Sequence, residues 1–526
     1  MRGAGALRWV VLGLAALAPP LAGTAPAGER SEGFRHPADR EYRAALDLVY
    51  EGAFRAAETR LAALSTEYSD DPVGPYLQAL ALEWRLEQGP PSVSLDRELL
   101  ALADLSLARA DARLLDDGAD ARALMARGAA HGVKSRHHLF RWHRTPARRE
   151  AVRMRAALLE AKAGGAEGAD LDFGLGLYDY YADTLPRFFR LLRVLARIPG
   201  GDRERGLDAI ARVARGGSLF HDDEACVQMF DIRSYFEHRP DGALHWIRRM
   251  WQRHPGWPLW GLKLAELLRD LGLFDESASV ARAILTTAEA KQHVNYQPVV
   301  GAMARVVLGE ALLLDLRPGL AREATRPVIA GVPEAGWVGP RAALVVARSF
   351  DLQGDHDAAI PHYRRVASGS DRAAAARARE ALESPLTSRM CLAWQRLARS
   401  RRLHEEGRPR EARALCLEAL RTDPSNAEAR VCVAETSLRS DDPASARALV
   451  RDVVEDDGTP MWIRPRARLV LARAFEREGR EGAALPLYKK VWEEPCGRPA
   501  LRAEAATAIA RLAPATTLSA APRWER

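Results

Sequence analysis

The chain has few cysteines, five in 526 residues. None of them forms a CxxC pair, a CxxCH haem-attachment site or a zinc-ligand spacing, which excludes the common thiol-redox and zinc-binding classes. We expect buried single thiols on helices. A disulfide between Cys416 and Cys432, the closest pair in sequence, stays open as an alternative in an oxidising compartment. The five cysteines are Cys226, Cys391, Cys416, Cys432 and Cys496.

Aromatic residues are also scarce, at 7% of the chain, and so are stretches rich in valine, isoleucine and threonine. Alanine, arginine, leucine and glutamate dominate instead, and these side chains lose little rotamer freedom in a helix. A composition of 47% hydrophobic and 28% charged residues is typical of a folded protein. The sequence therefore predicts an all-α fold.

Catalytic motifs are missing as well. The chain contains no GxSxG, no P-loop and no catalytic Cys/His signature. The pair Gly174-x-Gly176 lacks a third glycine at the right spacing and a preceding strand, so it does not indicate a nucleotide loop. The carboxylates of "HDDEAC" (residues 221–226) are interpreted as complementing the dipole at a helix start. We predict that the protein is not an enzyme and has no cofactor and no catalytic residue.

The charge of the chain is nearly balanced, because 77 basic and 70 acidic residues leave a formal net charge of +7. This excess is a mild bias and only weak evidence for a nucleic-acid partner, and none is expected. Residues 131–149 are an exception, since six basic residues and four histidines stand there without a carboxylate. Clustered histidines suit a transition metal, but the positive field disfavours a cation. We expect an exposed basic patch with no metal, and keep an enzyme or metal protein using the histidines of residues 131–143 as an alternative.

The apolar run near the start of the chain, Trp9–Leu17, is too short and too soon followed by prolines to span a bilayer. Two arginines precede its apolar core and a small-residue site, Ala25-Pro26-Ala27, follows it, as in an export signal. We therefore predict a signal peptide over residues 1–27, a linker over 28–40 and a location in a bacterial periplasm. No cysteine lies near the cleavage region, so no lipid anchor is expected. Retention as an uncleaved anchor stays open.

Two stretches of the chain repeat each other. "ARSFDLQGDHDAAIPHYRRV" (residues 347–366) and "ARAFEREGREGAALPLYKKV" (residues 472–491) share nine of twenty aligned positions. With Ala347 at position 8 of a unit, Gly354 falls at 15 and Ala359 at 20. Small residues at 8 and 20 let two helices approach closely, and the glycine ends the first helix. The pattern resembles the tetratricopeptide repeat, a helix–turn–helix of 34 residues.

The resemblance implies further copies and a stacked architecture. The frame recurs at Ala265, Gly309, Ser400 and Ala434, and the unit after these comes 38 residues on, because "DDGTPMW" lengthens the connection. "LVYEGAFRAAETRLAAL" near the N-terminus has the form of a turn and second helix. Since one unit leaves its apolar face uncovered, we predict a right-handed α-solenoid. Its expected parts are divergent repeats over 41–200, middle repeats over 201–380, C-terminal repeats over 381–512 and a flexible tail over 513–526.

Two local features depart from the simple frame. The proline shared by the two copies, Pro361 and Pro486, is expected to bend or delay the second helix of its unit. In the segment 172–217, an aromatic helix is predicted over 186–198, and Asp202 is predicted to cap the next helix. This segment resembles part of exported bacterial repeat proteins and, more distantly, of the tetratricopeptide-repeat-39 family, which implies no catalytic residue. We interpret the aromatic helix as buried between two solenoid halves, with a membrane-surface helix as the alternative.

In tetratricopeptide arrays the inner groove is lined by first-helix positions 2, 5, 9, 12 and 13. Position 5 is apolar here, so the lysine and asparagine clamp that binds a terminal carboxylate in one subclass is absent. The resemblance implies arginines over an apolar floor, suited to an acidic-hydrophobic protein segment, and a solvated arginine face is the alternative. The candidate partner-binding residues are Arg348, Arg401, His404, Glu435, Arg473 and Arg477.

These observations predict a non-enzymatic periplasmic scaffold or adaptor that binds protein or peptide segments, with envelope assembly as its suggested context. The alternatives are a helical protein that lies on a membrane surface through residues 186–198, and an enzyme or metal protein that uses the histidine segment. No nucleic-acid partner is expected, and a peripheral membrane contact stays open.

Overall fold

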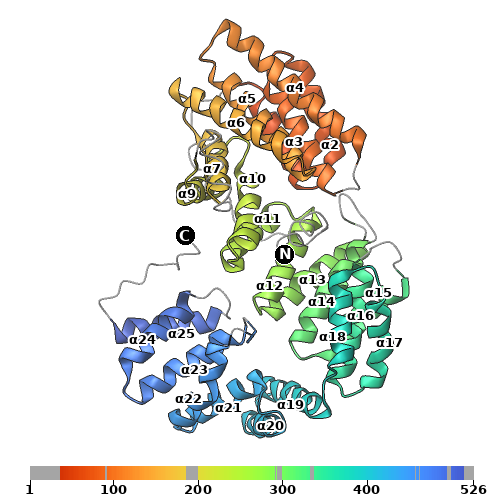
Figure 1. Cartoon of the computed structure of the whole chain (residues 1–526), viewed down its shortest axis with the longest axis vertical. Coiled ribbons are helices and arrows are strands. Elements are labelled where there is room, and N and C mark those ends of the chain that lie inside the picture. Colours follow the sequence, from red (N-terminus) through yellow and green to blue (C-terminus); the bar gives the residue numbers. More distant parts are fainter. Residues whose placement is uncertain are drawn as a thin grey trace. The chain divides into compact units, whose positions relative to one another are not determined.

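The computed structural model describes residues 36–88, 92–184, 200–290, 292, 299–331, 337–456, 458–460, 462–493 and 499–513. Every regular element within these residues is a helix, and no strand occurs among them (Figure 1), so the all-α prediction is confirmed. The predicted signal peptide, the aromatic helix over 186–198 and the tail beyond residue 513 lie outside the described residues. In the part of the chain that is described, no helix has the length and apolar character needed to cross a bilayer.

The helices gather into two compact units. The first unit comprises the described residues up to 237 together with 246–260, and the second comprises 238–245 together with those from 261 onward. The helices α11 (Pro240–Arg253) and α12 (Pro258–Asp270) contribute residues to both units. The expected division into parts at residues 200 and 380 follows the type of repeat, and it stays a prediction.

In the first unit, consecutive helices pack against one another along the chain (Figure 1). The π-helical turn η2 directly continues the last helix before residue 237. Asp202 caps α9, because its side chain accepts a hydrogen bond of 3.0 Å from the backbone N–H of Arg205, as predicted. The elements are α1 (Asp39–Tyr50), α2 (Phe54–Glu67), α3 (Val73–Gln88), α4 (Val93–Asp116), α5 (Ala121–Phe140), α6 (Arg144–Ala163), α7 (Ala169–Asp183), α9 (Arg203–Arg215), α10 (Asp222–Asp231) and η2 (Ile232–Phe236).

The second unit repeats the same pairing of neighbouring helices (Figure 1). Helix α18 packs against α17 and stands between the pairs α16–α17 and α19–α20. After α12, the elements are α13 (Phe274–Glu289), α14 (Val299–Leu314), α15 (Pro318–Gly331), α16 (Val338–Leu352), α17 (His356–Ala367), α18 (Arg372–Glu383), α19 (Ser388–Glu405), α20 (Pro409–Thr422), α21 (Ala427–Arg439), α22 (Pro443–Glu455), α23 (Arg464–Arg477), α24 (Glu481–Glu493) and α25 (Pro499–Leu512).

The small residues of the repeat frame lie where the two helices of a unit touch. The hydroxyl of Ser400 at position 8 donates a hydrogen bond of 2.8 Å to the carbonyl of Ala412 at position 20. In another repeat the serine stands at position 20 and the alanine at position 8. There the hydroxyl of Ser277 donates a hydrogen bond of 2.7 Å to the carbonyl of Ala265. A larger side chain at either position would push the helices apart. The glycines at position 15 turn the chain with φ between 72° and 83°, a range that favours glycine; they are Gly52, Gly272, Gly354, Gly407 and Gly479.

The two copies that repeat most closely also share a polar contact. The hydroxyl of Tyr363 donates to the carboxylate of Asp351 at 2.6 Å, and that of Tyr488 donates to Glu476 at 2.6 Å. Both pairs join position 24 of the second helix to position 12 of the first. The repeated tyrosine therefore buries its ring between the helices while its hydroxyl satisfies a carboxylate.

The proline shared by the two copies does not delay its helix. Pro361 lies inside α17, which begins at His356, and Pro486 lies inside α24, which begins at Glu481. Of the two expected effects, the delay is therefore wrong, and the bend stays a prediction. Each proline falls in the second turn, where it removes one backbone donor but leaves the helix continuous.

In each of the two compact units, a tryptophan packs against the earliest glycine at position 15. In the first unit a β-carbon placed on Gly52 would lie 2.8 Å from Cγ of Trp257, and the ring of Phe54 packs edge-on against that indole at 5.3 Å. In the second unit Trp462 covers Gly272, and Phe274 packs edge-on against it at 5.6 Å. Each unit thus brings an early turn against a tryptophan about two hundred residues further along the chain.

The cysteines correct one expectation. Cys416 on α20 and Cys432 on α21 form a disulfide with a Cα–Cα distance of 6.0 Å, so the expectation of single thiols is wrong for this pair. It is confirmed for Cys226 and Cys391, which are free and buried. Cys496 lies outside the described residues. The disulfide joins the second helix of one repeat to the first helix of the next and so links two neighbouring units covalently.

Candidate functional site

Most of the predicted groove residues of the second unit are bonded within the chain. Arg401 donates to Asp315 through both the carboxylate, at 2.8 Å, and the backbone carbonyl, at 3.2 Å. Arg473 pairs with Glu504, and Arg477 bonds the carbonyl of Leu438 and the carboxylate of Asp441. Glu435 pairs with Arg466 at 3.1 Å. A partner's carboxylate would have to displace these internal acceptors.

Two of these pairs and a third, between Glu310 and Arg341, follow one rule, because each joins residues 31 apart on the first helices of successive repeats. They are Glu310 with Arg341, Glu435 with Arg466, and Arg473 with Glu504. Burial alone would raise the pKa of Glu310, but Arg341 and Arg269 outweigh it and lower that pKa to about 2. This carboxylate therefore stays ionised and paired. The inner face of the first helices holds the repeats together.

Two of the predicted groove residues remain exposed. Arg348 on α16 and His404 on α19 are exposed, and neither makes an ion pair or side-chain hydrogen bond with the described residues. Arg439 on α21 shares these properties. The expected apolar floor is not accessible, because the position-5 residues are buried in the helix cores; they are Leu262, Leu344, Leu397, Val431 and Leu469. The face therefore offers isolated cations without an exposed apolar strip of position-5 side chains.

The first unit contains a buried polar centre around residues 218–224, a segment whose sequence predicted only a simple helix start. His221 joins two helices, since its Nδ1 lies 2.6 Å from Asp170 on α7 and its Nε2 lies 2.6 Å from the hydroxyl of Tyr76 on α3. Asp170 also accepts from the hydroxyl of Ser218 at 2.6 Å. Burial would raise the pKa of Asp170, but these bonds lower it to about 2. An ionised carboxylate only accepts, so Nδ1 of His221 carries a hydrogen.

The neighbouring carboxylates of this segment bind two further helices. Glu224 accepts hydrogen bonds of 3.1 Å from Tyr50 on α1 and Trp84 on α3. Asp223, only 1% exposed, lies within ion-pair distance of Arg43, Arg253 and His254. These carboxylates therefore do more than complement the dipole of α10. They tie α1, α3 and α11 to the start of α10.

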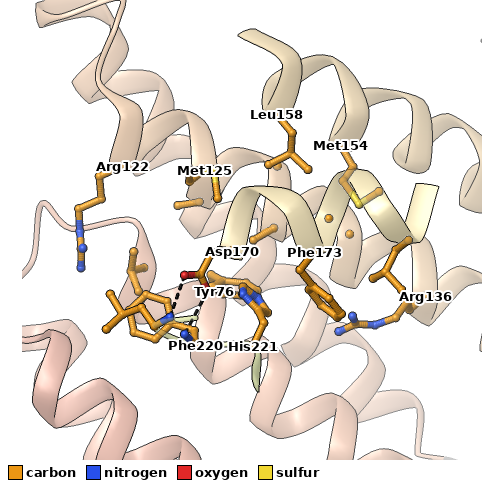
Figure 2. Close-up of a pocket in the computed structure, with 18 residues that line it drawn as sticks. Tyr76, Arg122, Met125, Arg136, Met154, Leu158, Asp170, Phe173, Phe220 and His221 are labelled. Carbon is orange, nitrogen blue, oxygen red and sulfur yellow. Dashed lines mark hydrogen bonds and ion pairs between the residues drawn. The ribbon is translucent and has the colours of Figure 1, made fainter. Parts of the chain in front are cut away.

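A cavity of about 70 Å³ opens beside the polar centre (Figure 2). Met154 and Leu158 of α6 face it from one side, opposite Tyr76 and His221 (Figure 2). Its two arginines are already paired, Arg122 with Asp71 at 2.8 Å and Arg136 with Glu83 at 2.6 Å. Its other apolar lining residues include Met125, Phe173 and Leu177. The cavity suits a small apolar group better than an anion.

Neither Tyr76 nor Cys226 is an activated nucleophile. Burial raises the pKa of Tyr76 and raises the pKa of the Cys226 thiol to about 12. Both groups therefore keep their protons near neutral pH, whereas a nucleophile must lose its proton. The hydrogen bonds that link Asp170, His221 and Tyr76 hold α7, the start of α10 and α3 together, which is a structural role.

The histidines of residues 131–143 are held apart by separate partners. His131 bonds Glu150 at 2.6 Å, while His137 is buried with Nε2 3.8 Å from Asp96. The ring of His138 lies 5.9 Å from that of His137 and 6.0 Å from that of His143. Within the described residues, no three His, Cys, Asp or Glu side chains are arranged to hold a metal ion. The histidines that are close together in the sequence therefore do not form a set of metal ligands among the described residues.

Comparison with known proteins identifies the repeat. A family model of the tetratricopeptide repeat matches residues 403–474, which run from the end of α19 into α23. Residues 403–474 thus match the tetratricopeptide repeat. No curated protein sequence matches it.

Several solved structures resemble the chain weakly. They include the tetratricopeptide domain of P58(IPK), with 10% identity and a TM-score of 0.22 over 92% of this chain and 100% of that one. Another is the APC/C hetero-tetramer Cut9–Hcn1, with 14% identity and a TM-score of 0.24 over 90% of this chain and 89% of that one. Yeast Tom70 has 12% identity and a TM-score of 0.25 over 90% and 96%. At such TM-scores these likenesses support no argument about function.

Proposed function

We propose that this protein is a non-enzymatic scaffold that binds acidic segments of other proteins on the first-helix face of its second unit. The observation that carries the proposal is the repeat itself, since tetratricopeptide arrays present stacked helices to extended or helical protein segments.

Arg348 is the residue on which the proposal is most directly tested. It stands at position 9 of its unit, is exposed, and has no ion-pair partner among the described residues. Its guanidinium is therefore available to a carboxylate without breaking an internal bond. Arg401 and Arg473 are less suitable, because replacing either one also removes a contact between repeats.

The test compares two arginines that differ in position alone. Arg348→Glu on α16 is matched by Arg365→Glu on α17, an exposed arginine on a second helix. Both variants change the charge equally, and both should unfold at the same denaturant concentration as the wild type. We expect Arg348→Glu to reduce the partners recovered after cross-linking in the native cell envelope by roughly tenfold, the effect of one charge-assisted bond. Equal recovery with both variants would contradict the proposal.

We also propose that the protein works in the periplasm, where envelope assembly is the suggested context. The support is the export-like start of the sequence together with the disulfide between Cys416 and Cys432, because cytosolic thiols are kept reduced. Cell fractionation followed by alkylation tests the location. The bridge should be found oxidised in the periplasmic fraction, and recovery of the protein in the cytosol with both thiols alkylated would refute it.

A further inference from the structure

The turn between α5 and α6 presents a surface that the scaffold proposal does not use. Leu139 is 51% exposed and Trp142 is 54% exposed, whereas large apolar side chains are usually buried. His143, Arg144, Arg148 and Arg149 are exposed around them. We call these six residues, Leu139, Trp142, His143, Arg144, Arg148 and Arg149, the α5–α6 tip.

The backbone of the tip is held in an unusual conformation. Trp142 has φ of 63°, in the left-handed region that a bulky residue rarely occupies and that costs about 1 to 2 kcal/mol. A glycine or asparagine would fill this position without the cost. A large aromatic side chain at a strained and exposed turn indicates a use other than stability.

The positive charge of the tip is not neutralised within the described residues. Arg148 and Arg149 make no ion pair there, and Arg144 lies over the ring of Trp142, with 5.9 Å to the centroid. The neighbouring carboxylate of Asp96 is occupied by Arg141 at 2.7 Å. The first turn of α6 contains no acidic residue, and the positive end of the helix dipole lies at the same place.

We propose that the α5–α6 tip docks on a membrane surface containing anionic phospholipids. Tryptophan and leucine beside a cluster of arginines match a lipid surface, which offers an apolar layer directly beneath negative headgroups. An acidic polypeptide or a nucleic acid would meet the arginines but offers less apolar surface to Leu139. The proposal uses residues outside the scaffold face, so either proposal can fail alone.

The test uses the full chain and vesicles of two compositions. Vesicles of phosphatidylcholine alone are compared with vesicles of equal parts phosphatidylcholine and phosphatidylglycerol. Co-sedimentation measures binding, and hydrogen exchange of backbone amides in residues 139–149 reports contact at the tip itself. The local readout is needed because the apolar N-terminal segment can bind both kinds of vesicle.

Two variants of the tip are matched by controls. Arg148→Gln combined with Arg149→Gln is compared with Arg364→Gln combined with Arg365→Gln on α17, which removes the same charge from other exposed positions. Trp142→Gly is compared with Leu115→Ala, because Leu115 is 88% exposed. Trp142→Gly should fold at least as well as the wild type, since glycine favours the left-handed backbone.

We expect slower exchange at the tip with the anionic vesicles only, reversed by high salt. Each arginine removed should weaken partitioning roughly fivefold, and Trp142→Gly should weaken it further, while both controls bind like the wild type. Equal protection by the two vesicle types would overturn the proposal. So would tip variants that bind like their controls, or binding to polyglutamate in place of anionic vesicles.

Discussion

Trp462 lies directly against the α-carbon of Gly272, so that a methyl group on the glycine would overlap the tryptophan side chain. The two residues belong to one unit but are 190 positions apart. The seven-residue stretch that lengthens the repeat to 38 residues, "DDGTPMW", ends on this tryptophan. The insertion therefore has a structural role, because it brings an indole from the connection before α23 onto the turn between α12 and α13.

This contact predicts different costs for the same substitution at two turn glycines. Gly272→Ala and Gly479→Ala both place a β-carbon at φ near 75°, since the two glycines have φ of 77° and 72°. No atom lies within 4 Å of the added carbon at Gly479, so its cost is the backbone strain of about 1 to 2 kcal/mol. Gly272→Ala should cost at least about 1 kcal/mol more, from overpacking.

Denaturant unfolding of the two variants measures this difference in the free energy of unfolding. Trp462→Gly combined with Gly272→Ala should recover the overpacking part, because glycine removes the Cβ of Trp462 that the added carbon would overlap. Equal destabilisation by the two single alanine substitutions would show that the tryptophan does not constrain the turn.

The tyrosines of the two closest repeats should differ in their contribution to stability. Each carboxylate keeps one other partner when its tyrosine becomes phenylalanine, His356 for Asp351 and Arg511 for Glu476. Asp351 is only 2% exposed, whereas Glu476 lies nearer to solvent. A buried acceptor that loses a donor costs about 1 to 3 kcal/mol, and an exposed one less. Tyr363→Phe should therefore lower the free energy of unfolding more than Tyr488→Phe, as followed by circular dichroism in urea. The reverse order would contradict the assignment.

Acid should weaken the first unit through Asp170. The pKa of this carboxyl is lowered to about 2 by its bonds to His221 and Ser218, against the raising effect of burial. A lowered pKa stabilises the fold at pH above about 4, and the contribution is lost as pH falls toward 2. The loss is about 2 kcal/mol.

The variant Asp170→Asn tests this dependence. Its free energy of unfolding should be lower at neutral pH, but should fall less between pH 4 and 2 than that of the wild type. Asp208→Asn on α9, an exposed position, should keep the wild-type pH profile. If the free energy of unfolding of Asp170→Asn fell with pH as steeply as that of the wild type, the Asp170 carboxylate would not be the cause of the acid sensitivity.

The disulfide should stabilise the repeats that it joins. Cys416 and Cys432 close a loop of sequence separation 16, and a cross-link of this length contributes about 3 kcal/mol. Reduction should therefore lower the denaturant midpoint and release two additional thiols in a colorimetric titration of the unfolded protein. An unchanged thiol count would mean that the bridge does not form.

The features that depend on short spacings could be predicted from the sequence. Positions 8, 15 and 20 of the repeat recur within one helix pair, so the spacing alone places Ser400, Gly407 and Ala412 at the contact and the turn of their unit. The same frame did not show which inner-face residues are paired with one another. The signal was nevertheless in the sequence, because opposite charges recur 31 residues apart at Glu435 and Arg466.

The contacts of the first unit could not be predicted from spacing. Asp170, His221 and Tyr76 are separated by 51 and 145 residues, and their meeting depends on how divergent repeats curve. The basic stretch at residues 131–149 was predicted only in part. Its predicted exposure is correct only for Arg144, Arg148 and Arg149. The prediction is wrong for Arg136 and Arg141, because carboxylates distant in sequence, Glu83 and Asp96, pair with them. The strained position of Trp142 depends on the fold of the turn.

Site-specific photo-cross-linking tests the scaffold account most directly. A photoreactive amino acid placed at residue 348, and in parallel at residue 365, is activated in intact cells, and the adducts are identified by mass spectrometry. The account predicts a defined protein adduct at 348 that maps to an acidic segment of a partner and is missing at 365. Adducts of equal yield at both positions, or none at 348 while the protein is folded, would contradict it.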